Sequence, residues 1–270
     1  MKYGFSTLSC PSWNFREIIT SAKDLGYHGV EIRGISEKMY APKIKYFSDE
    51  RIEDTMRYLD TLGIEIPMLT TGAEIAVKGK EESALEEAYA YVDLASRLNV
   101  PYIRLLCANT AAPSGGDRDI AAKLYIQICQ YAQKKRVSPL IETNGIFADT
   151  KLLKEFMDSV NCGNKGVLWD IHHPYRFMGE SVDQTLSNIG KLIKYVHIKD
   201  SVMDKGQVVY KMSGYGDVPI QEAINKLRKS GYNGYLTYEW VKRWNKALEE
   251  PGVALCHYIN FIKTYIEKPS

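Results

Sequence analysis

The chain alternates short apolar runs with longer amphipathic segments from end to end. An apolar run of about four to eight residues favours a buried strand, and apolar residues spaced three or four apart favour a helix. On this basis we expect strands at 2–6, 29–32, 64–69, 102–107, 139–143, 167–170, 195–199 and 235–239. We expect helices at 14–25, 48–62, 81–98, 118–136, 150–160, 181–193, 220–230 and 252–266. Asn14 can cap the first helix, and Gly63 can end the second.

This alternation predicts the fold class. Strands that alternate with helices pair in parallel through right-handed crossovers. Eight such units close into a barrel more naturally than they form an open sheet. An open doubly wound sheet is the alternative, but no GxGxxG motif follows the first strand. No linker rich in Pro, Gly or Ser interrupts the pattern, so we predict an α/β protein, a single-domain (β/α)₈ TIM barrel over residues 1–270.

The longest connections predict where an active site would lie. They follow strands and cover residues 35–47, 108–117 and 201–219. In a (β/α)₈ barrel, the loops that follow the strands form the active-site face.

Four apolar runs in the second half end on residue types that bind metals. They are Pro139-Leu-Ile-Glu142, Val167-Leu-Trp-Asp170, Tyr195-Val-His197 and Tyr235-Leu-Thr-Tyr-Glu239. A charge at the end of a buried strand is costly unless something there requires it. Adjacent strands lie about 4.8 Å apart, so the four side chains can converge on one cation. Three carboxylates and one imidazole suit Mn²⁺ or Mg²⁺ and, less specifically, Zn²⁺ or Co²⁺.

Each of these residues also has an ordinary structural interpretation. Glu142 could cap a turn, Asp170 could pair with a lysine, and His197 could be a core histidine with satisfied hydrogen bonds. The combination of four, rather than any single residue, predicts the metal site.

Composition excludes some classes of function. A net charge of +2 and a pI near 8.1 argue against an extended nucleic-acid surface. The five cysteines are scattered without a CxxC pair, which is typical of a reducing compartment. No apolar stretch has the length of a membrane span or a signal peptide. We therefore expect a cytoplasmic protein with no nucleic-acid or membrane partner.

The residues around the four ligands resemble a known family. The segments Ile141-Glu-Thr-Asn-Gly145, Leu168-Trp-Asp-Ile-His-His173, Val196-His-Ile-Lys-Asp200 and Tyr238-Glu239 are similar to the xylose isomerase-like TIM-barrel family of sugar isomerases and epimerases. The likeness extends to Leu25-Gly-Tyr-His-Gly-Val-Glu-Ile32 and covers essentially the whole chain. The family includes ketose 3-epimerases, hydroxypyruvate isomerase, inosose dehydratase and 3-dehydroshikimate dehydratase. The resemblance implies that Glu142, Asp170, His197 and Glu239 bind one divalent metal, and that the two glutamates are the catalytic acid/base pair.

This set of residues suits chemistry at a carbon next to a carbonyl. A divalent cation that holds the carbonyl and its neighbouring hydroxyl acidifies the C–H between them by stabilising a cis-enediolate. A carboxylate on each face can remove the proton and return it. We therefore expect an isomerase or epimerase of a small keto-sugar or polyol, with or without a phosphate group. The alternative is a lyase of the inosose or 3-dehydroshikimate dehydratase type, which loses a β-hydroxyl from the same enediolate.

Two residues beside the ligands are candidates for substrate binding. His173 lies three positions after Asp170, where the epimerases resembled here often carry a substrate-contacting histidine. Lys199 lies on the same side of its strand as His197 and matches a lysine of the dehydratases. A loop imidazole and a solvated strand-end lysine are their structural alternatives.

Arg104 and Asn144 complete the candidate substrate site. Arg104 lies inside the apolar run 102–107, and a buried guanidinium requires a carboxylate or an anionic ligand. An ion pair with Glu31 or Glu142 is the alternative. Asn144 occupies a position where many relatives have histidine.

The chain also departs from the ketose 3-epimerases. These carry a glutamate six residues after the first metal glutamate and an arginine six after the metal histidine, where this chain has Ala148 and Met203. Gly214-Tyr-Gly-Asp217 resembles the family's glycine-bracketed turn over the site, although a hairpin end would look the same. Lys242 and Arg243 could bind a phosphate or form a solvated basic pair.

Two other classes share the barrel. An apurinic-type DNA repair endonuclease uses three zinc ions and further histidines on the early strands, but only His28 precedes the sixth strand here. A barrel retained as an inactive binding subunit would not keep four buried ligands. The expected partner is a small carbohydrate. The sequence leaves the oligomeric state open between a monomer and a homo-oligomer, although barrels of this kind commonly form dimers or tetramers.

Overall fold

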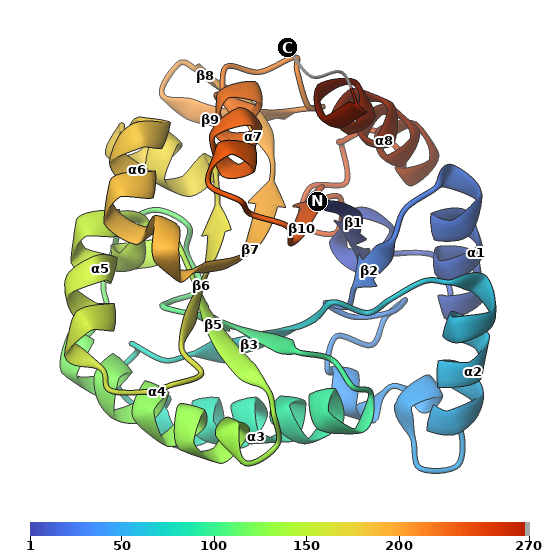
Figure 1. Ribbon diagram of the computed structural model, residues 1–270, viewed down its shortest axis with the longest axis horizontal. Helices are drawn as coiled ribbons and strands as arrows, with labels where there is room; N and C mark the ends of the chain where they lie inside the picture. Colours follow the sequence, from blue (N-terminus) through green and yellow to red (C-terminus); the bar gives the residue numbers. More distant parts are fainter. Residues whose placement is uncertain (268–270) are drawn as a thin grey trace. The chain divides into compact units, whose positions relative to one another are not determined.

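A computed structural model of the chain describes residues 1–267 and divides into two compact units. The first unit contains residues 1–67 and 196–267, and the second contains residues 68–195. Figure 1 follows the alternation of strands and helices along the chain. Within residues 1–267, each unit contains parallel strands, and two short strands form a separate antiparallel hairpin.

In the first unit, the parallel strand order is β2-β1-β10-β7. Helix α1 packs against β2, and helix α8 packs against β1. The elements of this unit are β1 (Lys2–Ser6), α1 (Phe15–Leu25), β2 (Gly29–Glu31), α2 (Ile52–Leu62), β8 (Asp200–Asp204), β9 (Gln207–Lys211), α7 (Ile220–Lys229), β10 (Tyr235–Tyr238) and α8 (Pro251–Glu267).

In the second unit, the parallel strand order is β6-β5-β4-β3. Helix α3 packs on β3 and β4, helix α4 packs on β5, and α5 packs on α6. The elements are β3 (Met68–Glu74), α3 (Glu81–Arg97), β4 (Tyr102–Leu106), α4 (Arg118–Gln133), β5 (Ser138–Glu142), α5 (Thr150–Ser159), β6 (Gly166–Asp170) and α6 (Val182–Ile189). Strand β7 (Ile193–Ile198) begins in this unit and ends in the first.

Local signals set two helix ends where the sequence predicted them, the start of α1 and the end of α2. The Asn14 side chain accepts hydrogen bonds from the N–H groups of Arg16 and Glu17, and the Glu17 carboxylate accepts from the N–H of Asn14. This capping box satisfies N–H groups that the first turn leaves without helical partners. Gly63 ends α2 at φ 65°, a left-handed conformation that favours glycine.

Several elements differ from the sequence prediction. Helix α2 begins at Ile52 rather than at residue 48, and α6 ends at Ile189 rather than at residue 193. The expected third strand at 64–69 is displaced to Met68–Glu74, because Pro67 has no N–H to donate to a neighbouring strand. Glu65, just before it, pairs with Gly29 of β2 instead. The connection expected at 201–219 contains the antiparallel hairpin of β8 and β9, whose residues are only partly buried and lack a clear apolar pattern.

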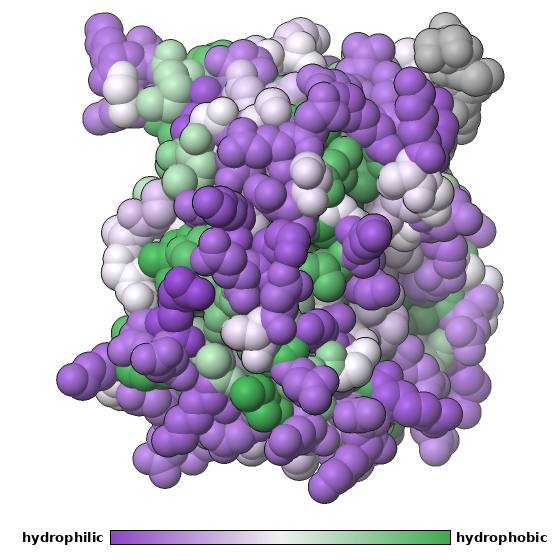
Figure 2. All heavy atoms as spheres, turned by 60° about the vertical axis from the view of Figure 1, so that its left-hand side comes forward, coloured by the Kyte–Doolittle hydropathy of each residue, from purple (hydrophilic) through white to green (hydrophobic). Residues whose placement is uncertain are grey.

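Apolar residues fill the strands, and polar residues face the solvent. Strands β4, β5 and β6 are buried almost throughout, as expected for parallel strands covered on both faces. Hydrophilic residues cover most of the face drawn in Figure 2, and hydrophobic residues are visible between them as small patches. None of the helices within residues 1–267 has the length and apolar character needed to cross a bilayer.

The Asp200 carboxylate holds the connection that follows the hairpin. It accepts hydrogen bonds from the backbone N–H groups of Ser201, Gly214, Gly216 and Val218 at 2.8–3.3 Å. Burial raises the pKa of Asp200, and these N–H groups oppose that shift. A Cβ atom at Gly216 would lie 2.0 Å from the carboxylate, so only glycine fits there. The glycine-bracketed turn is therefore anchored on one buried side chain.

We predict that Asp200→Asn destabilises the protein by about 1–3 kcal/mol, because an amide NH₂ would replace an acceptor facing backbone N–H groups. Urea denaturation monitored by circular dichroism measures this loss. Asp204→Asn is the matched control on the exposed end of the same hairpin, and it should change stability by less than about 0.5 kcal/mol. Equal effects of the two substitutions would contradict the anchoring role of Asp200.

Candidate metal centre

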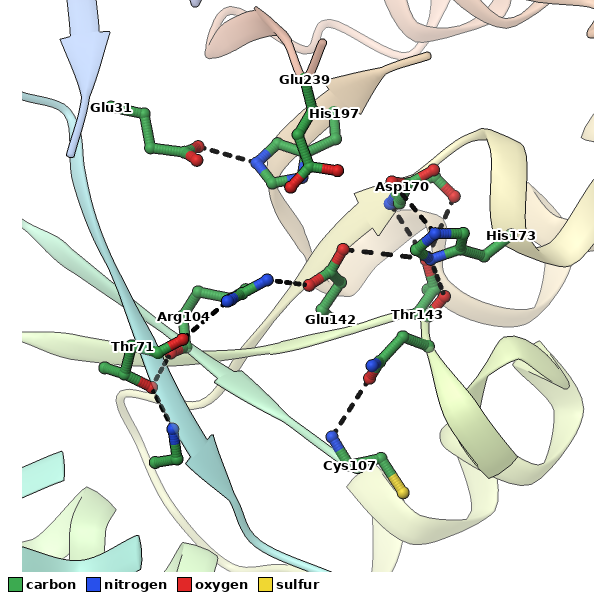
Figure 3. A network of polar contacts seen from close by, with 12 residues as sticks. Glu31, Thr71, Arg104, Cys107, Glu142, Thr143, Asp170, His173, His197 and Glu239 are labelled. Carbon is green, nitrogen blue, oxygen red and sulfur yellow. Dashed lines mark hydrogen bonds and ion pairs between the residues drawn. The ribbon is translucent and has the colours of Figure 1, made fainter. Parts of the chain in front are cut away.

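In the second unit, a buried carboxylate ends each of two neighbouring strands. Glu142 is the last residue of β5 and is 1% exposed, and Asp170 is the last residue of β6 and is fully buried. Strands β5 and β6 pair in parallel, so both carboxylates lie at the C-terminal edge of the sheet. Figure 3 shows that Arg104 and His173 point toward them. The sequence predicted all four of these residues as site residues.

The Arg104 guanidinium pairs with Glu142. Its Nη1 lies 2.7 Å from Oε2 of Glu142, and its Nη2 donates to the backbone oxygen of Thr71 at 2.6 Å. The Thr71 hydroxyl donates in turn to the backbone oxygen of Arg104 at 2.7 Å. The sequence left Glu31 and Glu142 as possible partners of Arg104, and the structure pairs it with Glu142. The Nε–H of Arg104 is buried without a hydrogen-bond partner among the described residues.

His173 lies against both carboxylates of this unit. Its Nδ1 is 3.1 Å from the backbone oxygen of Thr143 and 3.9 Å from Oε1 of Glu142, and its Nε2 is 3.6 Å from Oδ2 of Asp170. A carbonyl oxygen only accepts, so Nδ1 carries the proton toward Thr143. In the neutral ring, Nε2 is then an acceptor. The ligand atoms of Asp170, His172 and His173 lie within 4.8 Å of one another.

In the first unit, His197 lies between two carboxylates. Its Nε2 is 2.7 Å from Oε2 of Glu31, and its Nδ1 is 3.5 Å from Oε1 of Glu239. The Lys199 ammonium pairs with the other oxygen of Glu239. All four side chains are at most 4% exposed as residues. Glu31 is the last residue of β2, and Glu239 directly follows β10, so this cluster also lies at C-terminal strand ends.

This geometry suits a cation beside Nδ1 of His197. Two donor atoms that each lie about 2.1 Å from an ion, at an angle of about 90–110°, are about 3.0–3.4 Å apart. The 3.5 Å between Nδ1 of His197 and Oε1 of Glu239 is close to that range and is long for a direct hydrogen bond. The donor set therefore fits a divalent metal.

Glu31 was missed as a site residue by the sequence analysis. The signal was present, because Gly29-Val-Glu31 is one more buried strand that ends on a carboxylate. The four strand ends that predict the metal site all lie in the second half of the chain, whereas Glu31 lies near its start. The contact between Glu31 and His197, residues 166 positions apart, exists only in the folded chain.

Two other candidates make contacts of a structural kind. The Asn144 amide accepts from the N–H of Cys107 at 3.1 Å and donates to the backbone oxygen of Ala108 at 2.9 Å, which holds the connection after β4. A substrate contact by Asn144 stays a prediction. Lys242 donates to the backbone oxygens of Lys246 and Leu248 and to the Glu250 carboxylate at 2.6–2.8 Å. Its three N–H groups are thus used within the protein.

Comparisons with known proteins agree with this arrangement of elements. Residues 19–256 match the model of the xylose isomerase-like TIM barrel family. A fructoselysine 3-epimerase from Escherichia coli O157:H7 is 23% identical over 261 residues, which cover 89% of this chain and 90% of that protein.

Solved structures show the same fold. A probable 3-DHS dehydratase from Bacillus anthracis aligns with a TM-score of 0.79 at 18% identity, covering 97% of this chain and 99% of that one. The IOLI protein with a bound zinc atom aligns with a TM-score of 0.80 at 17% identity, covering 99% and 98%. The (β/α)₈ fold predicted from the sequence is confirmed. The chain belongs to the xylose isomerase-like TIM barrel family.

Proposed function

We propose that this protein is a divalent-metal-dependent isomerase or epimerase of a small keto-sugar or polyol. The observation that carries the proposal is a set of buried ligand-type side chains at strand ends, which could hold a metal ion. We assign the metal to Glu142, Asp170, His197 and Glu239. The barrel fold supports this assignment, because the C-terminal strand ends of a barrel form its active-site face. Mn²⁺ or Mg²⁺ suits the three carboxylates, and the imidazole also admits Zn²⁺ or Co²⁺.

The proposed reaction moves a proton on the carbon next to the substrate carbonyl. When bound, the cation would polarise the carbonyl and its neighbouring hydroxyl and so acidify the C–H between them. Glu142 and Glu239 would each serve one face of that carbon, one removing the proton and the other returning it. Return to the opposite face of the same carbon gives epimerisation, and return to the neighbouring carbon gives isomerisation.

Charged neighbours would orient the two glutamates for this role. Arg104 holds Oε2 of Glu142, and Lys199 holds Oε2 of Glu239. Each carboxylate thus has one oxygen fixed by a cationic side chain and presents its other oxygen from a defined direction. A fixed base needs no reorganisation when the reaction occurs, which is how positioned side chains contribute to rate.

The substrate is proposed to be a sugar because the relatives are sugar epimerases. His173 would accept a hydrogen bond from a substrate hydroxyl through Nε2, and the Nε–H of Arg104 would donate one. Ala148 is buried and Met203 is 47% exposed, so neither supplies the polar contact of the ketose 3-epimerases. The N–H groups of Lys242 are already used within the protein, which favours a substrate without a phosphate at that position.

Dehydration is the second candidate, and the Lys199 contact favours it. An ammonium held on Glu239 could protonate a β-hydroxyl so that it leaves as water, after a glutamate has removed the proton next to the carbonyl. Epimerisation exchanges a proton without loss of water, whereas dehydration forms an unsaturated product. Mass spectrometry of the product separates the two reactions.

We predict that Mn²⁺ stabilises the protein. At a free concentration of about 100 times its Kd, a ligand bound only to the folded state adds about 2.7 kcal/mol. Thermal unfolding with and without Mn²⁺ measures the gain, and a chelator should reverse it. Asp170→Asn should abolish most of the gain, whereas Glu65→Gln, a carboxylate outside the ligand set, should keep it. A wild-type protein that Mn²⁺ leaves unchanged would argue against the metal site.

We also predict that Glu142 and Glu239 are both needed for proton exchange. Fructoselysine and a panel of ketoses in D₂O would identify a substrate by deuterium incorporation next to the carbonyl, followed by NMR. Glu142→Gln and Glu239→Gln keep an oxygen and most of the shape but lose the base. Each should lower exchange by about 10²–10⁴-fold and remove exchange at one face.

Variants of the other two ligands are the controls for this assay. Asp170→Asn and His197→Gln should weaken metal binding, so excess metal should partly restore their exchange. If both glutamine variants exchange at the wild-type rate, the two-glutamate mechanism is wrong and His173 or Lys199 is the base.

A further inference from the structure

Glu31 has a carboxylate buried in the first unit that the proposed reaction does not use. It ends β2, is fully buried, and lies 2.7 Å from Nε2 of His197, which is also fully buried. Figure 3 shows its carboxylate pointing at the imidazole ring. A buried carboxylate is costly, and this one contacts an imidazole that we assign to the metal.

The 2.7 Å contact determines where the His197 ring carries its proton. A carboxylate that is ionised only accepts hydrogen bonds. If Nε2 carried no proton, its lone pair would face the Glu31 oxygen at 2.7 Å, and the two would repel. The alternative position for the proton, Nδ1, faces Oε1 of Glu239 at 3.5 Å, too far for a strong hydrogen bond. With Glu31 ionised, the short contact therefore requires a proton on Nε2.

We infer that Glu31 is a positioning residue that fixes His197 in its Nε2–H tautomer and directs the Nδ1 lone pair toward the cation. This inference rests on the proposed function for the presence of the metal, but the tautomer itself is a property of the metal-free protein. A histidine that binds a metal commonly donates its other N–H to a carboxylate, which orients the ring and strengthens it as a ligand.

Lys199 supports the same arrangement from the other side. Its ammonium takes Oε2 of Glu239, which leaves Oε1 as the glutamate oxygen beside Nδ1 of His197. Glu31 thus holds Nε2 of His197, and Lys199 holds Oε2 of Glu239. The other two atoms, Nδ1 of His197 and Oε1 of Glu239, lie 3.5 Å apart. Nδ1 of His197 and Oε1 of Glu239 are therefore already near each other in the metal-free protein. Metal binding would not require the His197 ring to change its tautomer.

The first experiment reads the tautomer directly in metal-free protein. Two-dimensional NMR of ¹⁵N-labelled protein at mildly alkaline pH distinguishes a protonated from an unprotonated ring nitrogen, and His197→Gln identifies the signals of His197. We expect protonated Nε2 and unprotonated Nδ1 in the wild type. In Glu31→Ala we expect the proton to move, in part or fully, to Nδ1. A wild-type ring protonated at Nδ1, or an unchanged pattern in Glu31→Ala, overturns the inference.

Glu31→Gln is the conservative variant, and Glu65→Ala is the matched control. The Gln amide oxygen can still accept from Nε2–H, so this variant should keep the wild-type tautomer, and it should fold if the alanine variant does not. Glu65 is also a carboxylate that contacts a neighbouring strand at 2.7 Å, through the Tyr235 hydroxyl. Its removal should leave the His197 signals unchanged. His197 signals that move equally in the two alanine variants would show a general loss of packing and would overturn the positioning role of Glu31.

Metal affinity provides the second readout, by calorimetric titration with Mn²⁺. Glu31→Ala should weaken binding by about 10–100-fold, as loss of a carboxylate behind a metal-binding histidine does. Glu31→Gln should lose less, and Glu65→Ala should stay within about 2-fold of the wild type. If the wild-type protein binds no metal, the proposed function is wrong. The NMR experiment on metal-free protein then tests the tautomer of His197 independently. Wild-type affinity in Glu31→Ala would overturn the positioning role.

Discussion

A carboxylate buried at the end of an apolar strand is stable only when a cation or a set of N–H donors lies against it. Glu31, Glu142, Asp170 and Glu239 are all buried in this way, and none is more than 4% exposed. The surrounding polar structure follows from this constraint. Each carboxylate needs compensation from residues that the fold brings to it.

In each unit, a cationic side chain pairs with one oxygen of a buried glutamate. Arg104 takes one oxygen of Glu142 in the second unit, and Lys199 takes one oxygen of Glu239 in the first. An imidazole faces the remaining oxygen in each case, His173 at 3.9 Å and His197 at 3.5 Å. These contacts are long for direct hydrogen bonds, so in each unit a carboxylate oxygen and a ring nitrogen lie near each other without a short hydrogen bond between them.

Such an arrangement favours function at some cost in stability. Replacing a buried ion pair with apolar residues of similar volume is often neutral or stabilising, so packing alone does not explain these charges. A site that must bind a cation and hold a sugar needs donors fixed before the ligand arrives. Our inference for Glu31 extends this idea to a residue behind a proposed ligand, because its contact with Nε2 of His197 would fix the proton of the ring on that nitrogen.

The sequence by itself determined the order of the elements, the fold class and the residues at the strand ends. Apolar runs that end on Glu142, Asp170, His197 and Glu239 are local signals, and the strand–helix alternation excludes most other topologies. The capping box at Asn14 and the glycine at position 63 are local as well.

Tertiary structure alone decided the partners. Arg104 could have paired with Glu31 or Glu142, and nothing in the order of residues selects between them. The contact of Glu31 with His197 joins residues 166 positions apart, and the anchoring of the turn by Asp200 joins the two ends of one long connection. Hydrophobic periodicity within one segment specifies which of its faces is buried, because apolar side chains leave water whatever element they pack against. A hydrogen bond or ion pair depends on atomic distances, and only the packed chain sets those distances.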